Sequence, residues 1–401
     1  MPENRLINES FLKDGKVRFL RHIRSNQTIY HPLWIFFFVR FLLLFWMWGL
    51  RHVFPQPIIP DPVLRPYLGV AIEENPWLEP WQRWDTLHYQ AIAERGYGAF
   101  DSALFVPPLF PLLMKVVGSV LGGNTLIAGI LISNAAFLCS LIVLYRLTSY
   151  EMQNVDVARR AILYLSSFPS AFFLLAAYTE SLFLLASLLT MLYVRKEKYW
   201  QAGIWGCLAA LTRLPGVMIL LPLIYHALVK CVKERIWKPW IAVIITLVGS
   251  ALFPLYVWLV LHSPPWTPWK IQEARFRGGL AFPGANILEA IQEIFNGNAS
   301  ISRLIDIVFL LFFILCLTQV WRQLPRIYSI FYIAFIGIYL IRTSMIDPLL
   351  SIDRYVLVLF PAFMVMGYWG RMPIVHRAIL YFSWIGLLYL SGQFAIWGWA
   401  G

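Results

Sequence analysis

The sequence predicts an all-α polytopic membrane protein, a bundle of about 11 transmembrane helices with a large first extracytoplasmic loop, since each crossing needs roughly 20 apolar residues. Of the 401 residues, 59% are hydrophobic and only 13% are charged, whereas a soluble domain carries about 25% charged residues. The apolar residues come in runs of about 15 to 24, repeated from Leu33 to Trp397, as a bilayer requires. No polar linker divides these runs, so we expect residues 33–401 to form one membrane-embedded domain.

The net charge of +12 does not indicate a nucleic-acid partner. Most Lys and Arg lie in short connections beside apolar runs, which is the distribution that the positive-inside rule describes. The four cysteines lie in or beside apolar segments without metal-ligand spacing, so they predict neither disulfides nor a metal site.

The N-terminal segment 1–32 has four basic residues and no acidic residue between Lys16 and Arg24, which places it in the cytoplasm. The first span, 33–54, is followed by a stretch, 55–103, with three basic and seven acidic residues, which should lie outside. The next apolar run, 104–121, contains three prolines that do not suit a spanning helix. We therefore expect residues 55–124 to form a first extracytoplasmic loop with a re-entrant or interfacial segment.

The remaining spans then alternate so that the basic clusters lie on the cytoplasmic side. They are expected at 125–147, 161–177, 181–195, 199–213, 215–230, 239–262, 304–321, 327–342, 352–370 and 376–397. A second extracytoplasmic loop, 263–303, begins with a cluster of Pro and Trp residues typical of the membrane interface. Several spans are short for a bilayer, and Pro169 and Pro215 can end helices partway. This pattern predicts a hollow within the membrane.

Under this topology, polar residues that interrupt apolar segments gather near the outer face. They are Asp85, His88, Glu180, Arg213, Asp347, Asp353, Arg354 and Tyr355. An ionised group within the membrane costs roughly 2.5–3.5 kcal/mol, so their convergence indicates a polar cavity. Two structural alternatives remain open: Glu180 could pair with Arg213 or Arg354 only as a structural contact, and Arg354 could extend to lipid phosphates. Arg40 and Asp306, deeper in their helices, resemble structural partners.

The densest polar stretch runs from Trp81 to Tyr97. Asp85 and His88 fall on one face of an expected helix, and Gly96 provides its C-terminal stop. Asp85 is either the N-cap of this helix or a general base held beside Trp84 as an aromatic sugar platform.

These motifs resemble the GPI mannosyltransferase 2 (PIG-V-type) family. The stretch from Arg83 to Tyr97 is similar to its WD-x-x-H-[FY] and I-A-x-x-G-Y elements, and Phe105 to Pro111 to its proline-rich element. In the latter, Val106-Pro107-Pro108 replaces the usual Phe-Phe-Pro. Further along the chain, 167–170 with 177–183 resembles SP…YTESLF, 209–216 resembles A-x-x-T-R-x-x-G, and Arg354-Tyr355 with Phe360-Pro361 resembles RY…FP.

The resemblance implies a GT-C-like fold, a polyprenyl-phosphate sugar donor and transfer of mannose with inversion to a lipid-linked or glycan acceptor. For such a transfer the candidate catalytic residues are Asp85, His88 and Glu180, and the candidate substrate-binding residues are Trp84, Tyr178, Arg213, Arg354 and Tyr355. Asp85 would be the base, with the two arginines stabilising the leaving phosphate. No cofactor is required; a divalent ion between Asp85 and Glu180 is an alternative without a clear ligand set.

The sequence also allows other functional classes. A transferase of the same class could use arabinose or glucose, and a lipid or solute transporter or a structural subunit of a membrane complex would also carry outer-face charges. The expected location is a prokaryotic plasma membrane, or the endoplasmic reticulum for a eukaryotic chain, with the active site extracytoplasmic. Membrane lipids are expected partners, and the need for an accessory subunit is left open.

Overall fold

The computed structural model describes residues 27–55, 61, 65–297, 301–342, 344 and 347–398. These residues form helices joined by short connections, with only two isolated β-bridges between them. The prediction of an all-α protein is confirmed. Most of the predicted cytoplasmic segment 1–32 lies outside the described residues.

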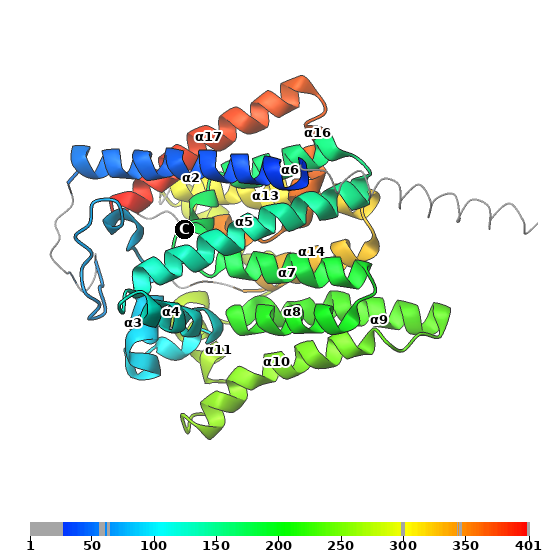
Figure 1. Cartoon of the computed structure of the whole chain (residues 1–401), viewed down its shortest axis with the longest axis horizontal. Helices are drawn as coiled ribbons and strands as arrows, with labels where there is room; N and C mark the ends of the chain where they lie inside the picture. The colour runs from blue at the N-terminus through cyan, green and yellow to red at the C-terminus, as the bar shows by residue number, and fades with distance from the viewer. Residues whose placement is uncertain are drawn as a thin grey trace, which may run out of the picture.

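The helices of the main bundle run side by side along one axis, and successive helices run back and forth (Figure 1). They are α2 (Gln27–Val53), α5 (Thr125–Met152), α6 (Val155–Ser167), α7 (Glu180–Arg195), α8 (Tyr199–Thr212), α9 (Leu220–Glu234), α10 (Trp240–Leu259), α13 (Ile301–Gln323), α14 (Arg326–Leu340), α16 (Phe360–Trp369) and α17 (Pro373–Ala395). Within the described residues, six helices are long and apolar enough to cross a membrane. The polytopic class is thus supported, whereas the count of 11 crossings is not confirmed.

Small residues allow close contact between α8 and α10. A Cβ atom added at Gly203 would lie 2.8 Å from the Ile245 Cβ, and one added at Gly249 would lie 2.5 Å from the Cys207 Sγ. Close backbone approach at small residues is a usual way for helices to associate in lipid, where the hydrophobic effect contributes little between them.

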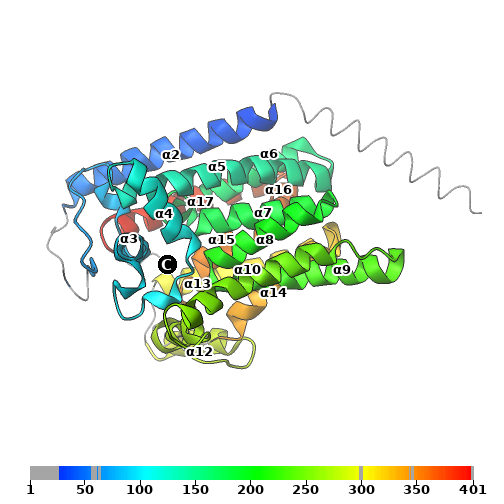
Figure 2. The ribbon, with the colours of Figure 1, turned by 60° about the horizontal axis from the view of Figure 1, so that its bottom comes forward.

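Three short helices gather at the end of the bundle where α2 ends: α3 (Asp85–Arg95), α4 (Leu109–Val120) and α11 (Thr267–Gln272) (Figure 1). Another short helix, α12 (Ala285–Phe295), contacts α13 and α14 (Figure 2). The basic clusters in the first turns of α6 and between α9 and α10 lie at the opposite end. This separation of the two ends agrees with the alternation predicted from the charges.

Several helices stop before they reach the end that carries α3. Helix α6 ends at Ser167, before Pro169, and continues as the short helix η4 (Ala171–Leu174). Helix α8 ends at Thr212, before Pro215, and is followed by η5 (Leu214–Ile219). Helix α15 (Ile352–Leu357) is separated from α16 by a turn. The helix ends predicted at the two prolines are therefore present, and they leave space between the helices and α3.

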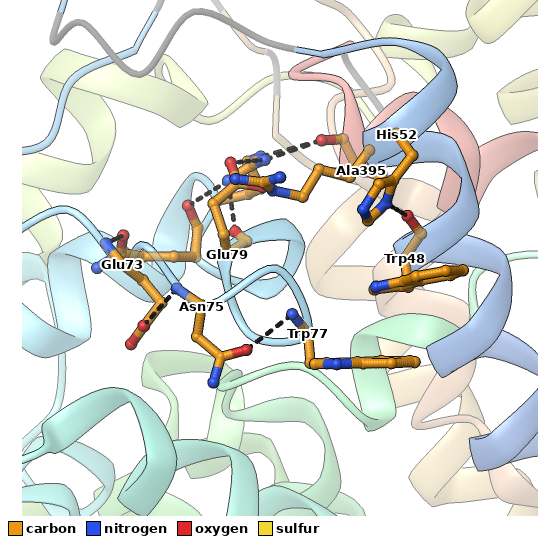
Figure 3. A network of polar contacts seen from close by, with 10 residues as sticks. Trp48, His52, Glu73, Asn75, Trp77, Glu79 and Ala395 are labelled. Carbon is orange, nitrogen blue, oxygen red and sulfur yellow. Dashed lines mark hydrogen bonds and ion pairs between the residues drawn. The ribbon is translucent and has the colours of Figure 1, made fainter.

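Arg83 links the loop before α3 to the end of α17. Its side chain is fully buried, with Nη2 bound to Glu79 Oε1 at 2.5 Å and to the Ala395 carbonyl of α17 at 2.9 Å. Figure 3 shows this region, where Trp77 also stacks on Trp48 of α2 with ring centroids 4.9 Å apart. These contacts hold the segment that leads into the site against both α2 and α17.

Replacing Arg83 by glutamine should destabilise the protein by about 1–3 kcal/mol, because the buried Glu79 carboxylate loses one of its two arginine partners and the Ala395 carbonyl loses its guanidinium donor. The matched control is Arg51→Gln, because Arg51 binds the same carboxylate at 3.1 Å with its side chain 26% exposed. A partly exposed pair of this kind contributes only about 0–1 kcal/mol. Thermal unfolding of the purified variants measures both values, and equal losses would contradict the assignment.

Candidate active site

A cavity of about 290 Å³ opens between α3 and the interrupted helices. Seven of the eight predicted site residues line it: Trp84, Asp85, His88, Tyr178, Arg213, Arg354 and Tyr355. They come from four separate segments of the chain, so the fold brings the predicted residues together. Glu180 is fully buried and lies behind the lining residues rather than among them.

Arg354 of α15 joins the two acidic residues of the site. Its Nη1 lies 2.8 Å from Asp85 Oδ2, while Nε and Nη2 donate to Glu180 Oε1 at 2.9 and 2.8 Å. Because guanidinium groups bind carboxylates in a planar fork, this arrangement fixes the Arg354 head group in one orientation. Arg354 therefore has protein partners inside the cavity and does not extend to lipid phosphates.

Glu180 holds the second arginine as well. Arg213 Nη1 lies 2.6 Å from the same Glu180 Oε1 atom, and its guanidinium packs 5.3 Å from the centre of the Tyr355 ring. Glu180 begins α7 and Arg213 is the C-cap of α8, so the ends of two interrupted helices meet here. Glu180, for which the sequence allowed a contact with either arginine, therefore binds both of them. Both guanidinium groups line the same cavity.

Asp85 is the first residue of α3, and the N-cap position belongs to Trp84. The N-cap alternative for Asp85 is therefore wrong: its carboxylate binds Arg354 instead of an amide of its own helix. Burial raises the pKa of the Asp85 carboxyl, but the positive charge of Arg354 outweighs burial and lowers the pKa overall. The carboxyl is therefore ionised near neutral pH. The predicted stop of this helix at Gly96 is confirmed, with a φ of +73°.

His88 lies one turn after Asp85 on the same side of α3. Its Nδ1 is 3.9 Å from Asp85 Oδ1, and its ring packs edge-on against Phe100 and Phe105. Burial among these rings lowers the pKa of His88 despite the opposing effect of Asp85. The imidazole is therefore neutral near pH 7 and can exchange hydrogen bonds with a bound hydroxyl.

Aromatic side chains form much of the remaining wall. Trp84 packs against Trp397 with ring centroids 5.6 Å apart. The Tyr178 ring lies 4.8 Å from the Arg354 guanidinium carbon and is only 1% exposed. Tyr355 packs against Tyr339 with ring centroids 5.5 Å apart. Apolar and aromatic walls with a few convergent charges are typical of small-molecule sites.

Sequence reasoning missed several lining residues. They are Pro66, Gln272, Leu350, Ser351 and Phe394. Gln272 ends α11 in the second predicted loop and also lines an adjoining cavity of about 40 Å³. Nothing in its local sequence distinguishes it from other loop residues. Only the fold brings it near the site.

The other polar residues considered from the sequence lie outside the cavity. Asp353 is buried, and its Oδ1 accepts a hydrogen bond from the Arg354 amide at 2.9 Å. Asp347 pairs with Arg303 at 2.9 Å. Arg40 packs 4.5 Å from the centre of the Trp81 ring. Asp306 is buried in α13.

In the part of the chain that the structure describes, no group of three or more His, Cys, Asp or Glu side chains could hold a metal ion. Asp85 and Glu180, the pair considered for a divalent ion, both bind Arg354. A cation placed between them would have to displace this guanidinium.

Comparison with known proteins gives a family match. The family model described as mannosyltransferase (PIG-V) matches residues 36–239, about half of the chain and three of the four segments that carry site residues. No curated protein matches the chain significantly. Among solved structures, the crystal structure of ArnT from Cupriavidus metallidurans bound to undecaprenyl phosphate is 13% identical, with a TM-score of 0.47, and the match covers 77% of this chain and 71% of that one. From the extent of the family match, the chain belongs to the mannosyltransferase (PIG-V) family.

Proposed function

We propose that the protein is an inverting glycosyltransferase that moves mannose from polyprenyl-phosphate mannose to a hydroxyl of a lipid-linked or glycan acceptor. The observation that carries this proposal is the position of Arg354, which holds a carboxylate and lines a cavity beside a second cation. A phosphate leaving group needs cations, and an attacking hydroxyl needs a base. Membership of a mannosyltransferase family favours mannose as the sugar.

In the proposed reaction, the acceptor oxygen forms a bond to C1 of the sugar as the bond from C1 to the phosphate oxygen breaks. The acceptor proton passes to the Asp85 carboxylate, and the bonding electrons leave with polyprenyl phosphate. Because this leaving group is a stable anion at neutral pH, no general acid is required. Attack opposite to the leaving group inverts the configuration at C1.

The arginines would bind the phosphate, and Glu180 would hold them in place. In the unliganded site, Arg354 Nη1 is bound to Asp85, while Nε and Nη2 are bound to Glu180. A donor phosphate that contacts Nη1 would compete with Asp85 for this donor. Donor binding would then weaken the Asp85–Arg354 ion pair and make the carboxylate a stronger base for the acceptor.

The remaining predicted residues complete the proposed site. His88, neutral beside Asp85, would accept or donate a hydrogen bond to the acceptor or orient the base. Trp84 and Tyr355 line the cavity and offer aromatic surface to a pyranose ring.

The pH dependence of transfer should report the ion pair between Asp85 and Arg354. A base acts only in its deprotonated form, so kcat/KM falls as the pH drops through the pKa of the free enzyme's base. Since Arg354 lowers the pKa of Asp85 against the effect of burial, Arg354→Gln should move this acidic limb to higher pH as well as reduce the rate. Arg377→Gln, at an exposed residue, is the control. An unchanged limb in the Arg354 variant would exclude Asp85 as the titrating base.

The proposal is tested with purified protein in lipid nanodiscs and labelled donors. Transfer is measured from polyprenyl-phosphate mannose, polyprenyl-phosphate glucose and GDP-mannose to a glycolipid extract, and NMR of the product determines the anomeric configuration. Transfer that uses only polyprenyl-phosphate mannose among the three donors, with inversion at C1, supports the proposal. Transfer from GDP-mannose, retention at C1 or no transfer overturns it, while a preference for the glucose donor overturns the choice of sugar.

The side of the membrane is tested separately. Single cysteines at Glu74, in the predicted first loop, and at Glu234, at the opposite end of the bundle, are both exposed positions. In a background without the four native cysteines, an impermeant maleimide should label position 74 in intact cells and position 234 only after lysis. The reverse pattern would place the cavity on the cytoplasmic side.

A further inference from the structure

The turn that leads into α3 has an unusual backbone at Trp84. The Thr86 amide donates to the Arg83 carbonyl at 3.0 Å, which closes a four-residue turn around Trp84 and Asp85. Trp84 has φ +48° and ψ −118°, close to the first central position of a type II′ turn. Glycine dominates this position because a Cβ atom disfavours positive φ. A bulky residue with such a φ is strained.

Strain of this kind persists only where surrounding contacts hold it, and it concentrates at functional sites. Here the Tyr178 hydroxyl forms hydrogen bonds to the residues before and after Trp84. It accepts a hydrogen bond from the Asp85 amide at 3.2 Å and donates one to the Arg83 carbonyl at 3.4 Å. The two backbone groups lie on either side of Trp84, so one hydroxyl contacts both ends of the strained unit.

Tyr178 is itself firmly placed. The Ser133 hydroxyl of α5 donates to the Tyr178 carbonyl at 3.0 Å, and the Tyr178 ring packs against the rings of Phe173 and Phe394. The side chain is almost fully buried, although Tyr178 also lines the cavity. Because these contacts fix Tyr178 independently of the turn, its hydroxyl can restrain the backbone of the turn.

The turn determines where Asp85 points. Because Trp84 takes the N-cap position, Asp85 enters the helix as its first residue with its carboxylate 2.8 Å from Arg354 Nη1. The Tyr178 ring also faces the Arg354 guanidinium at 4.8 Å, a favourable cation–π distance. Tyr178 thus contacts both the backbone amide of Asp85 and the Arg354 guanidinium that binds the Asp85 carboxylate.

We propose that Tyr178 is a positioning residue that holds the Arg83–Thr86 turn in its strained form and thereby fixes Asp85 against Arg354. This role refines the proposed function, on which its effect on transfer rests. It differs from the sugar platform expected for Tyr178, because one face of the ring is directed at Arg354 and little of the ring is exposed.

The test uses glycine to remove the strain. Glycine adopts positive φ about as readily as negative φ, so a Trp84→Gly protein no longer needs the Tyr178 hydroxyl to hold the turn. Trp84→Ala is the matched control, since it also lacks the indole but keeps the Cβ atom. Tyr178→Phe is introduced into the wild-type, Trp84→Ala and Trp84→Gly backgrounds.

We expect Tyr178→Phe to lower kcat about tenfold in the wild-type and Trp84→Ala backgrounds, the effect of losing one or two hydrogen bonds. In the Trp84→Gly background, Tyr178→Phe should lower kcat less than about threefold. In all three backgrounds, Tyr178→Phe should leave the KM for the donor unchanged. Equal losses in the alanine and glycine backgrounds would overturn the proposal. A change confined to the donor KM would return Tyr178 to the role of sugar platform and likewise overturn it.

A second measurement does not depend on transfer. Thermal unfolding of the same proteins should show a larger drop in Tm on loss of the hydroxyl with alanine at position 84 than with glycine. The entropy that glycine adds to the unfolded chain cancels in this comparison. If the wild-type protein transfers no sugar, the proposed function fails, but the unfolding comparison still decides whether Tyr178 holds the turn.

Discussion

Replacing Asp85 by asparagine is expected to reduce transfer from polyprenyl-phosphate mannose at least about a hundredfold, because a positioned general base contributes about 10²–10⁴ in rate. Asparagine keeps the size of the side chain and can still hydrogen-bond to Arg354, so the cavity should keep its shape. The loss should appear in kcat, since the proton transfer occurs in the transition state. Single-turnover rates with saturating donor measure this step directly.

The matched control is Asp101→Asn, which makes the same chemical change at an exposed residue of the first predicted loop that does not line the cavity. Its transfer rate should equal that of the wild-type protein. If Asp85→Asn retained near-normal turnover at normal expression, Asp85 would not be the base. The cavity would then have to activate the acceptor by another group, and His88 would be the next to test.

Much of the fold could be predicted because each part rests on a local signal. Apolar runs mark the long helices, Pro169 and Pro215 mark where helices end early, and Gly96 marks the end of α3. Apolar runs reflect the lipid that surrounds the helices, and the effects of proline and glycine reflect backbone stereochemistry. Both causes act within a short segment of the chain. The number of crossings lacked such a signal, because several helices are too short to be distinguished from buried ones by composition alone.

The candidate site could be predicted as a set of residues, but its contacts only as alternatives, such as the pairing of Glu180 with Arg213 or Arg354. Glu180 and Arg354 lie 174 positions apart, and their hydrogen bond at 2.8 Å depends on how α7 and α15 pack. The turn at Trp84 was missed for a related reason: tryptophan is among the least expected residues at positive φ, so local preference argued against the observed backbone. Tertiary contacts from Tyr178 supply what the local sequence does not.

Replacing Glu180 by alanine is expected to destabilise the protein by about 3–5 kcal/mol, the cost of breaking a buried ion pair and leaving its partner unpaired. Glu180 is fully buried and its Oε1 atom binds both Arg213 and Arg354. Without it, two guanidinium groups would share the region with Asp85 as the nearest anion, so Arg354 should also be held less firmly.

The exposed ion pair between Glu234 and Lys230, at 2.7 Å, provides the control. Glu234→Ala should cost no more than about 1 kcal/mol, because solvent replaces most of an exposed pair. In thermal unfolding of the purified proteins, the Glu180 variant should therefore lose several times more stability than the Glu234 variant. Adding Arg213→Met to Glu180→Ala should restore part of the loss, since it removes one of the two cations left without a partner. If the double variant were no more stable than Glu180→Ala, the cost would come from the cavity left by the side chain and not from its charge, and Glu180 would serve as packing rather than as the anion that holds the two arginines.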